Sequence, residues 1–137
     1  GLVAITPAAG FVPAWAAFLI GAGGAAGAYW GVTGLKRLLK IDDSLDVFAV
    51  HGVGGILGSL LIPFLAAAGP LAPGLEMSTG AQFGVQLLGV AVVAVYSAIM
   101  TGAILFVIKL FIPLRVSTED EENGLDSATH GESAYHF

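Results

Sequence analysis

The sequence predicts an all-α fold, namely a polytopic transmembrane helix bundle with a short acidic cytoplasmic tail. Hydrophobic residues make up 56% of the 137 residues and charged residues only 11%, against about 25% charged residues in a soluble domain. Residues 1–35 and 77–108 carry no charged side chain, and about 20 apolar residues already span a bilayer as a helix. This composition excludes soluble globular, disordered and nucleic-acid-binding proteins.

The first predicted elements are one partial span and one full span. Residues 1–11 have the features of the end of a truncated transmembrane helix, because Pro7 removes a backbone donor and Gly10 is typical of a helix end. Residues 12–35 are predicted as a complete transmembrane helix. Since the chain begins in hydrophobic sequence without Met or a charged leader, we expect it to be the C-terminal piece of a longer protein.

Two more full spans are predicted after a cytoplasmic link at 36–44. The second span covers 45–67, and an external loop at 68–80 leads to a long third span at 81–114. A helix of this length exceeds the hydrocarbon thickness of about 30 Å, so we expect it to tilt or to extend into the cytoplasm. Residues 115–137 form the cytoplasmic tail.

Basic residues set the predicted orientation. The five bases are Lys36, Arg37 and Lys40 in the link, and Lys109 and Arg115 at the end of the last span. The positive-inside rule therefore places the link and the tail in the cytoplasm and the 68–80 loop outside. We expect a multi-pass protein of the plasma or inner membrane, in contact with the lipid bilayer.

Glycine is unusually frequent, with 20 residues in the chain. Many recur at helical spacing: Gly23, Gly27 and Gly31; Gly54 and Gly58; Gly80 and Gly84. Such stripes of small residues let helix backbones approach closely. We expect them to pack inside one subunit; the alternative is a dimerising helix.

His51 is the one ionisable residue deep inside a predicted span. Ionisable groups in a membrane normally face protein or a water path. A period of four places His51 on one helix face with Val47 and Gly55, with Gly54 and Gly58 beside it. The residues alone leave two hypotheses open, an imidazole that projects into a narrow pore or one that joins helices by a hydrogen bond.

Three acids precede His51. Asp42 and Asp43 are predicted to cap the second span, because carboxylates accept hydrogen bonds from free N–H groups at a helix start. Asp46 lies deeper and could stand at a cytoplasmic vestibule. The chain has no Cys and only three scattered His, so we expect no metal site, no cofactor and no enzymatic activity.

A longer pattern resembles a known family. The stretch DDSLDVFAVHGVGGILG, then a long last span and RVSTEDEENGLDSATHGESAY, resembles the C-terminal third of the ammonium transporters (Amt, related to the Rh proteins). AITPAAGFV is similar to the family's broken eighth helix. The resemblance implies an eleven-span subunit with an external N-terminus, assembled as a homotrimer for nitrogen uptake, with a narrow apolar pore in each subunit.

The resemblance also implies roles for three residues, and helical spacing adds Val47 to the face of His51. His51 matches one of two adjacent pore histidines that help to strip a proton from ammonium, and the second histidine lies in earlier spans that this chain does not contain. Asp46 matches an acid near the cytoplasmic end of the pore, and Thr6 the threonine of a Thr-Pro motif near the lumen. Val47 shares the pore-facing side of His51. An apolar pore imposes a large desolvation cost on the ammonium cation, and loss of the proton removes most of that cost.

The tail is expected to be regulatory. STEDEEN is predicted to be a solvated acidic run, and the segment from Gly124 to Tyr135 to be ordered against the cytoplasmic face, with a free tail as the alternative. Lys36, Arg37 or Lys40 could pair there with Asp126 or Glu132. In the family, the matching segment packs under the trimer and, in bacterial members, lies near the docking site of a P-II-type signal-transduction protein. Its matching residues here are Gly124, Leu125, Asp126, His130, Gly131, Glu132 and Tyr135.

Two other functions compete with ammonium transport. One is a membrane-embedded regulatory or sensor module of the same fold. The other is an unrelated polytopic subunit in which His51 only packs between helices.

Overall fold

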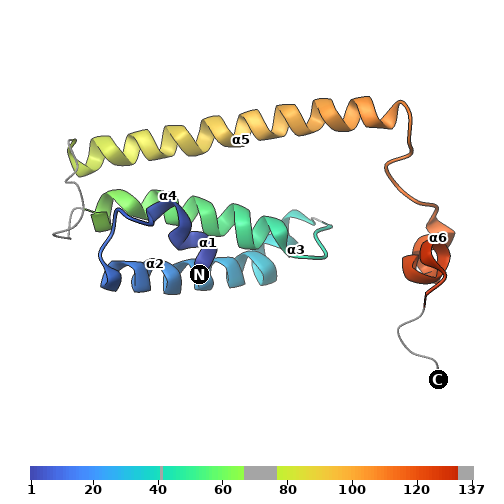
Figure 1. Ribbon diagram of the computed structural model, residues 1–137, viewed down its shortest axis with the longest axis horizontal. Helices are drawn as coiled ribbons and strands as arrows, with labels where there is room; N and C mark the ends of the chain where they lie inside the picture. The colour runs from blue at the N-terminus through green and yellow to red at the C-terminus, as the bar shows by residue number, and fades with distance from the viewer. Residues whose placement is uncertain (41, 67–76, 133–137) are drawn as a thin grey trace, which may run out of the picture. The chain divides into compact units, whose positions relative to one another are not determined.

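The computed structural model describes residues 1–40, 42–66 and 77–132, and within them the ordered elements are helices without any strand. The predicted all-α class is therefore confirmed. The α-helices are α1 (Leu2–Ile5), α2 (Ala14–Trp30), α3 (Lys36–Leu39), α4 (Gly54–Leu65), α5 (Thr79–Lys109) and α6 (Thr118–Asn123) (Figure 1). A 3₁₀ turn, η1 (Thr6–Ala8), and three π-helical turns, η2 (Gly31–Leu35), η3 (Phe48–Val53) and η5 (Asp126–His130), complete them.

The chain divides into two compact units, Gly1–Val93 and Ala94–Phe137. In the first unit, α1 packs against both α2 and α4, and α2 lies along α4 (Figure 1). The core between them is small and built from short side chains: Ala4, Ala8, Ile20, Ile62 and Ala66. Small side chains bring the three backbones close, as membrane helix packing requires.

Glycines make the closest of these contacts. A Cβ added at Gly24 would lie 2.1 Å from the Cβ of Ala4, and one at Gly58 would lie 1.9 Å from the Ala4 carbonyl oxygen. Gly27 and Gly31 pack in the same way against Leu57 and Ala49. The predicted close packing is therefore confirmed at Gly27, Gly31 and Gly58.

Three of the predicted glycines make no close contact among the described residues, so for them the prediction remains a prediction. A Cβ at Gly23, Gly80 or Gly84 would meet nothing within 4 Å. In α2 the neighbouring Gly24 makes the contact instead. The reason is the helix rotation of about 100° per residue, which turns Gly23 away from α1.

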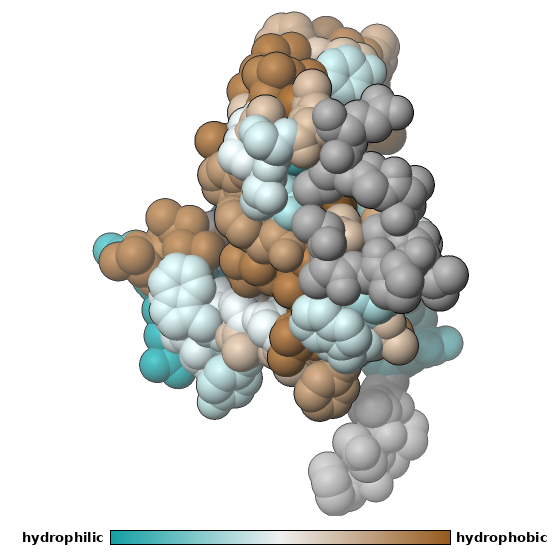
Figure 2. All heavy atoms as spheres, turned by 90° about the vertical axis from the view of Figure 1, so that its left-hand side faces the viewer, coloured by the Kyte–Doolittle hydropathy of each residue, from teal (hydrophilic) through white to brown (hydrophobic). Residues whose placement is uncertain are grey.

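Among the residues that the structure describes, two helices are long and apolar enough to cross a membrane, Phe48–Leu65 and Thr79–Lys109. Apolar side chains cover much of the face seen in Figure 2, and no residue of α5 is buried. The predicted first span is also helical, from Ala14 to Leu39. It is not one of these two helices, and its α-helical part α2 has 17 residues.

The predicted span limits need correction. The second span is helical only from Val47, after irregular backbone at 42–46. The third starts at Thr79 and ends at Lys109 rather than 114, where the N–H of Leu110 turns back to the carbonyl of Val107 at 3.1 Å. Pro113 disfavours helix for the residue before it. Most of the predicted 68–80 loop lies outside the described residues.

The acidic run of the tail forms a helix, α6, whose residues are largely exposed, as the predicted solvated run requires. Ser117 caps α6 by accepting a hydrogen bond from the N–H of Asp120 at 3.1 Å and donating its hydroxyl to the Asp120 carboxylate at 2.7 Å. Acids in the first turn also suit the positive end of the helix dipole. Arg115 closes the segment with two 2.7 Å bonds to Glu121.

Candidate functional site

His51 lies in the middle of η3, at the start of the helix that continues as α4. Its side chain is exposed in this chain, as is Val47 one turn earlier. A Cβ at Gly55, one turn later, would meet nothing within 4 Å. These three residues therefore form an open face of the helix.

A neighbouring side of the same helix is closed by packing. Gly54 and Gly58 are buried, and Cβ atoms added there would contact Val3 and Ala4 of α1. The two glycines predicted to lie beside the face of His51 are therefore packing positions. They hold the helix against α1, and this contact directs His51 away from the core of the first unit.

The backbone around His51 is a π-helical turn. Such turns are rare, and they occur frequently at functional sites because the extra residue per turn re-aims the side chains that follow. The turn packs on a second π-helical turn, η2. There a Cβ added at Gly31 would lie 3.0 Å from the Cβ of Ala49, so only glycine fits without displacing η3.

Asp43 caps the helix of His51. Its two carboxylate oxygens accept hydrogen bonds from the N–H groups of Val47 at 2.9 Å and Phe48 at 2.8 Å. The predicted capping role of Asp43 is confirmed.

Asp46 is held by a cation that the sequence did not assign to it. The ammonium of Lys36 donates to Asp46 Oδ1 at 2.7 Å and also to the Asp43 carbonyl oxygen. The possible pairing of Lys36 with Asp126 or Glu132 of the tail remains a prediction. The pair spans ten positions, which no local pattern indicates.

Thr6 is exposed, and its hydroxyl donates to the carbonyl oxygen of Leu2 at 2.8 Å. This bond within its own helical turn occupies the hydroxyl hydrogen and leaves the oxygen lone pairs to accept. Thr6 can therefore offer an acceptor to a ligand in this state.

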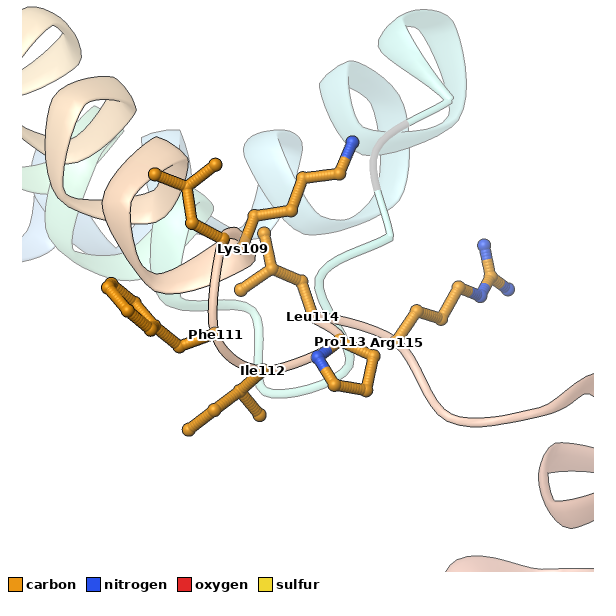
Figure 3. Close-up of a pocket in the computed structure, with 7 residues that line it drawn as sticks. Lys109, Phe111, Ile112, Pro113, Leu114 and Arg115 are labelled. Carbon is orange, nitrogen blue, oxygen red and sulfur yellow. The ribbon is translucent and has the colours of Figure 1, made fainter.

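The end of α5 forms a basic turn from Lys109 to Arg115. These residues line an open hollow, and Figure 3 shows Phe111 and Ile112 directed away from the Lys109 and Arg115 side chains. Exposed apolar groups next to cations are typical of a membrane–water interface.

The tail residues form a compact turn as far as the structure describes them. Gly124 and Gly131 have positive φ angles of 88° and 66°, which glycine adopts at low cost. Between them lies η5, closed by a 3.1 Å bond from the N–H of Glu132 to the carbonyl of Asp126. Leu125 is 46% exposed, and Tyr135 lies outside the described residues.

The carboxyl group of Glu121 in the tail is held in its ionised form. The hydrogen bonds from Arg115 lower the pKa of Glu121 below its ordinary value, because they favour the ionised carboxylate.

Comparison with known proteins gives a consistent result. The model of the Ammonium Transporter Family matches residues 1–135. Ammonium transporter 1 of Schizosaccharomyces pombe is 46% identical over the whole chain, the ammonium transporter of Aquifex aeolicus 47% over the whole chain, and that of Bacillus subtilis 42% over 98% of it.

The chain spans only about a third of these relatives, namely 30%, 32% and 34% of their lengths. No solved structure matches it significantly. With its apolar helices, the chain is a membrane protein with a transmembrane helical fold. It belongs to the ammonium transporter family.

Proposed function

We propose that this chain supplies one wall of a pore through which an ammonium transporter conducts ammonia or ammonium. The observation that carries the proposal is the exposed imidazole of His51 on a helix of membrane length. A polar ring directed into lipid would be costly, so an exposed histidine at this depth needs protein or a water path in front of it. The rest of the pore wall would then come from other parts of the transporter.

The chemistry of an imidazole suits this position. Bare ammonium loses most of its hydration on entry into an apolar channel, whereas ammonia loses far less. Imidazole exchanges protons readily and can act as donor or acceptor. His51 would therefore assist deprotonation, with Val47 on the same open face of the helix and Asp46 near its cytoplasmic end.

Replacement of His51 by Ala tests the proposal. In the complete transporter of which we propose this chain forms a part, the His51→Ala variant should lose selective ammonium uptake while the protein still reaches the membrane. Val50→Ala is the matched control, because Val50 is an adjacent, exposed residue without a proton to exchange. It should keep uptake near that of the unaltered protein.

The opposite result would support the packing hypothesis. Wild-type uptake and selectivity in His51→Ala would show that the imidazole only packs between helices. Equal loss of uptake in His51→Ala and Val50→Ala would show that the helix tolerates no side-chain truncation there. The proton-exchange role of His51 would then be refuted.

We further propose that the tail regulates transport from the cytoplasm in a homotrimer. The ordered turn between Gly124 and Gly131 supports this, because a fixed shape can dock on a surface. Its exposed Leu125 provides an apolar contact. A P-II-type signal-transduction protein is the partner that the family resemblance suggests.

A further inference from the structure

We infer that Lys36 is a positioning residue for the pore histidine, acting through Asp46 and the cap of the His51 helix. This inference rests on the proposed role of His51. Lys36 stands in α3, at the end of the long helical stretch that precedes the link. His51 stands one turn into the next helix, and the link between them has to fix the position of that turn.

The ammonium of Lys36 reaches the two acids that start the His51 helix. It donates to the carboxylate of Asp46 at 2.7 Å and to the backbone carbonyl of Asp43. Asp43 in turn accepts from the N–H groups of Val47 and Phe48 through its side chain. One cation therefore holds both residues on which the first turn depends.

The backbone of Asp46 explains why the link needs such a tie. Asp46 has a φ of 55°, a left-handed conformation that costs an L-residue roughly 1 kcal/mol or more. The carbonyl of Asp46 nevertheless accepts the N–H of Val50 at 2.9 Å, the bond directly before His51. If Asp46 relaxed to negative φ, this carbonyl would turn and the first turn of the His51 helix would lose this bond.

Burial makes the ion pair stronger than an ordinary surface pair. The Lys36 and Asp46 side chains are 28% and 33% exposed, and two hydrogen bonds from one ammonium add geometric definition. Without Lys36, the half-buried Asp46 carboxylate would have to turn towards water. The position of the imidazole would then no longer be fixed by the link.

The decisive variant is Lys36→Met in the complete transporter. Methionine keeps an unbranched stem of similar length but removes all three donors. Misplacement of a reacting group by about 1 Å costs up to roughly 100-fold in rate, so the maximal uptake rate per transporter molecule should fall about fivefold or more. The half-saturation concentration should change less than twofold, because Lys36 acts on a pore group and not on the outer entrance.

Three companion variants separate positioning from general damage. Arg37→Met removes a cation at the next, exposed position and should keep the rate within twofold. Lys36→Arg should recover at least half of the lost rate, because its guanidinium can again donate to both acceptors. Asp46→Asn combined with Lys36→Met should be no slower than the slower single variant, since both changes break the same pair.

The results also distinguish this inference from the proposed function. A Lys36→Met rate within twofold of wild type would overturn the positioning role, and so would multiplicative effects of the Lys36 and Asp46 changes. If Lys36→Met transports normally and His51→Ala is inactive in the same assay, the pore proposal stands and only the Lys36 inference fails. If His51→Ala transports normally, the proposed function itself is wrong.

Discussion

Substitution of Gly58 by Ala probes the closest contact in the helical core. A Cβ at this position would lie 1.9 Å from the carbonyl oxygen of Ala4 and 2.7 Å from its carbonyl carbon. Ordinary contacts begin at 3.4 Å, so α4 and α1 would have to separate by the difference, about 1.5 Å. The atoms in the way belong to the backbone of a helical turn, which cannot rotate aside as a side chain can.

The expected cost follows from two opposing effects. Overpacking costs about 1–3 kcal/mol, with a rigid backbone obstacle at the upper end. Replacing glycine by alanine inside a helix returns up to about 1 kcal/mol. Gly58→Ala should therefore destabilise the chain by about 2 kcal/mol. Gly55→Ala, on the same helix but with open space, should stabilise it by up to about 1 kcal/mol.

Unfolding of the 137-residue chain in detergent would measure these differences. Increasing amounts of sodium dodecyl sulfate unfold the chain, and the fluorescence of Trp15 and Trp30 on α2 reports the loss of packing. The reasoning is refuted if Gly58→Ala is at least as stable as the unaltered chain.

A rescue experiment sharpens the test. Gly24→Ala would clash with the Cβ of Ala4 at 2.1 Å, so an additional Ala4→Gly change should restore most of its stability. The same change should not rescue Gly58→Ala, because that clash involves Ala4 backbone atoms. Equal rescue of both variants would contradict the described contacts.

Two further predictions concern the tail and the topology. Because the pKa of Glu121 is lowered, its bond to Arg115 contributes to α6 fully above the ordinary pKa of 4.5 and is lost as the pH falls through the lowered value. Carboxyl NMR should show the pKa of Glu121 rising in Arg115→Gln, and an unchanged titration would contradict the bond. A reporter fused after Gly74 should lie outside the cell and one fused after Gly124 inside. If both reporters lie on the same side, α5 does not cross the membrane. An external reporter after Gly124 would also exclude a cytoplasmic regulatory role of the tail.

The sequence predicted the features that depend on local chemistry. Helical class, the cap by Asp43 and close packing at Gly27, Gly31 and Gly58 all follow from residue type and spacing. The π-helical turn at His51 did not, because an apolar helix with a weak pattern gives no sign of one extra residue per turn. The Gly24 contact was missed for a related reason, since two adjacent glycines look alike in a small-residue stripe.

Other features could be found only in the folded structure. The ion pair of Lys36 and Asp46 joins residues ten positions apart across the link, and its geometry depends on the positive φ of Asp46. The helix of the acidic tail depends on Ser117 and on the bonds between Arg115 and Glu121. Composition alone suggested only a charged, solvated segment there.

The lack of burial in α5 has a consequence for how its sequence can vary. No residue of its 31 is buried, although the ring of Phe83 meets that of Phe64 with centroids 5.5 Å apart. Most residues of α5 are exposed, and exchange of one apolar residue for another at those positions leaves the packing among the described residues largely unchanged. At the exposed positions, natural variation should therefore record the helix's surroundings more than the core of the described residues.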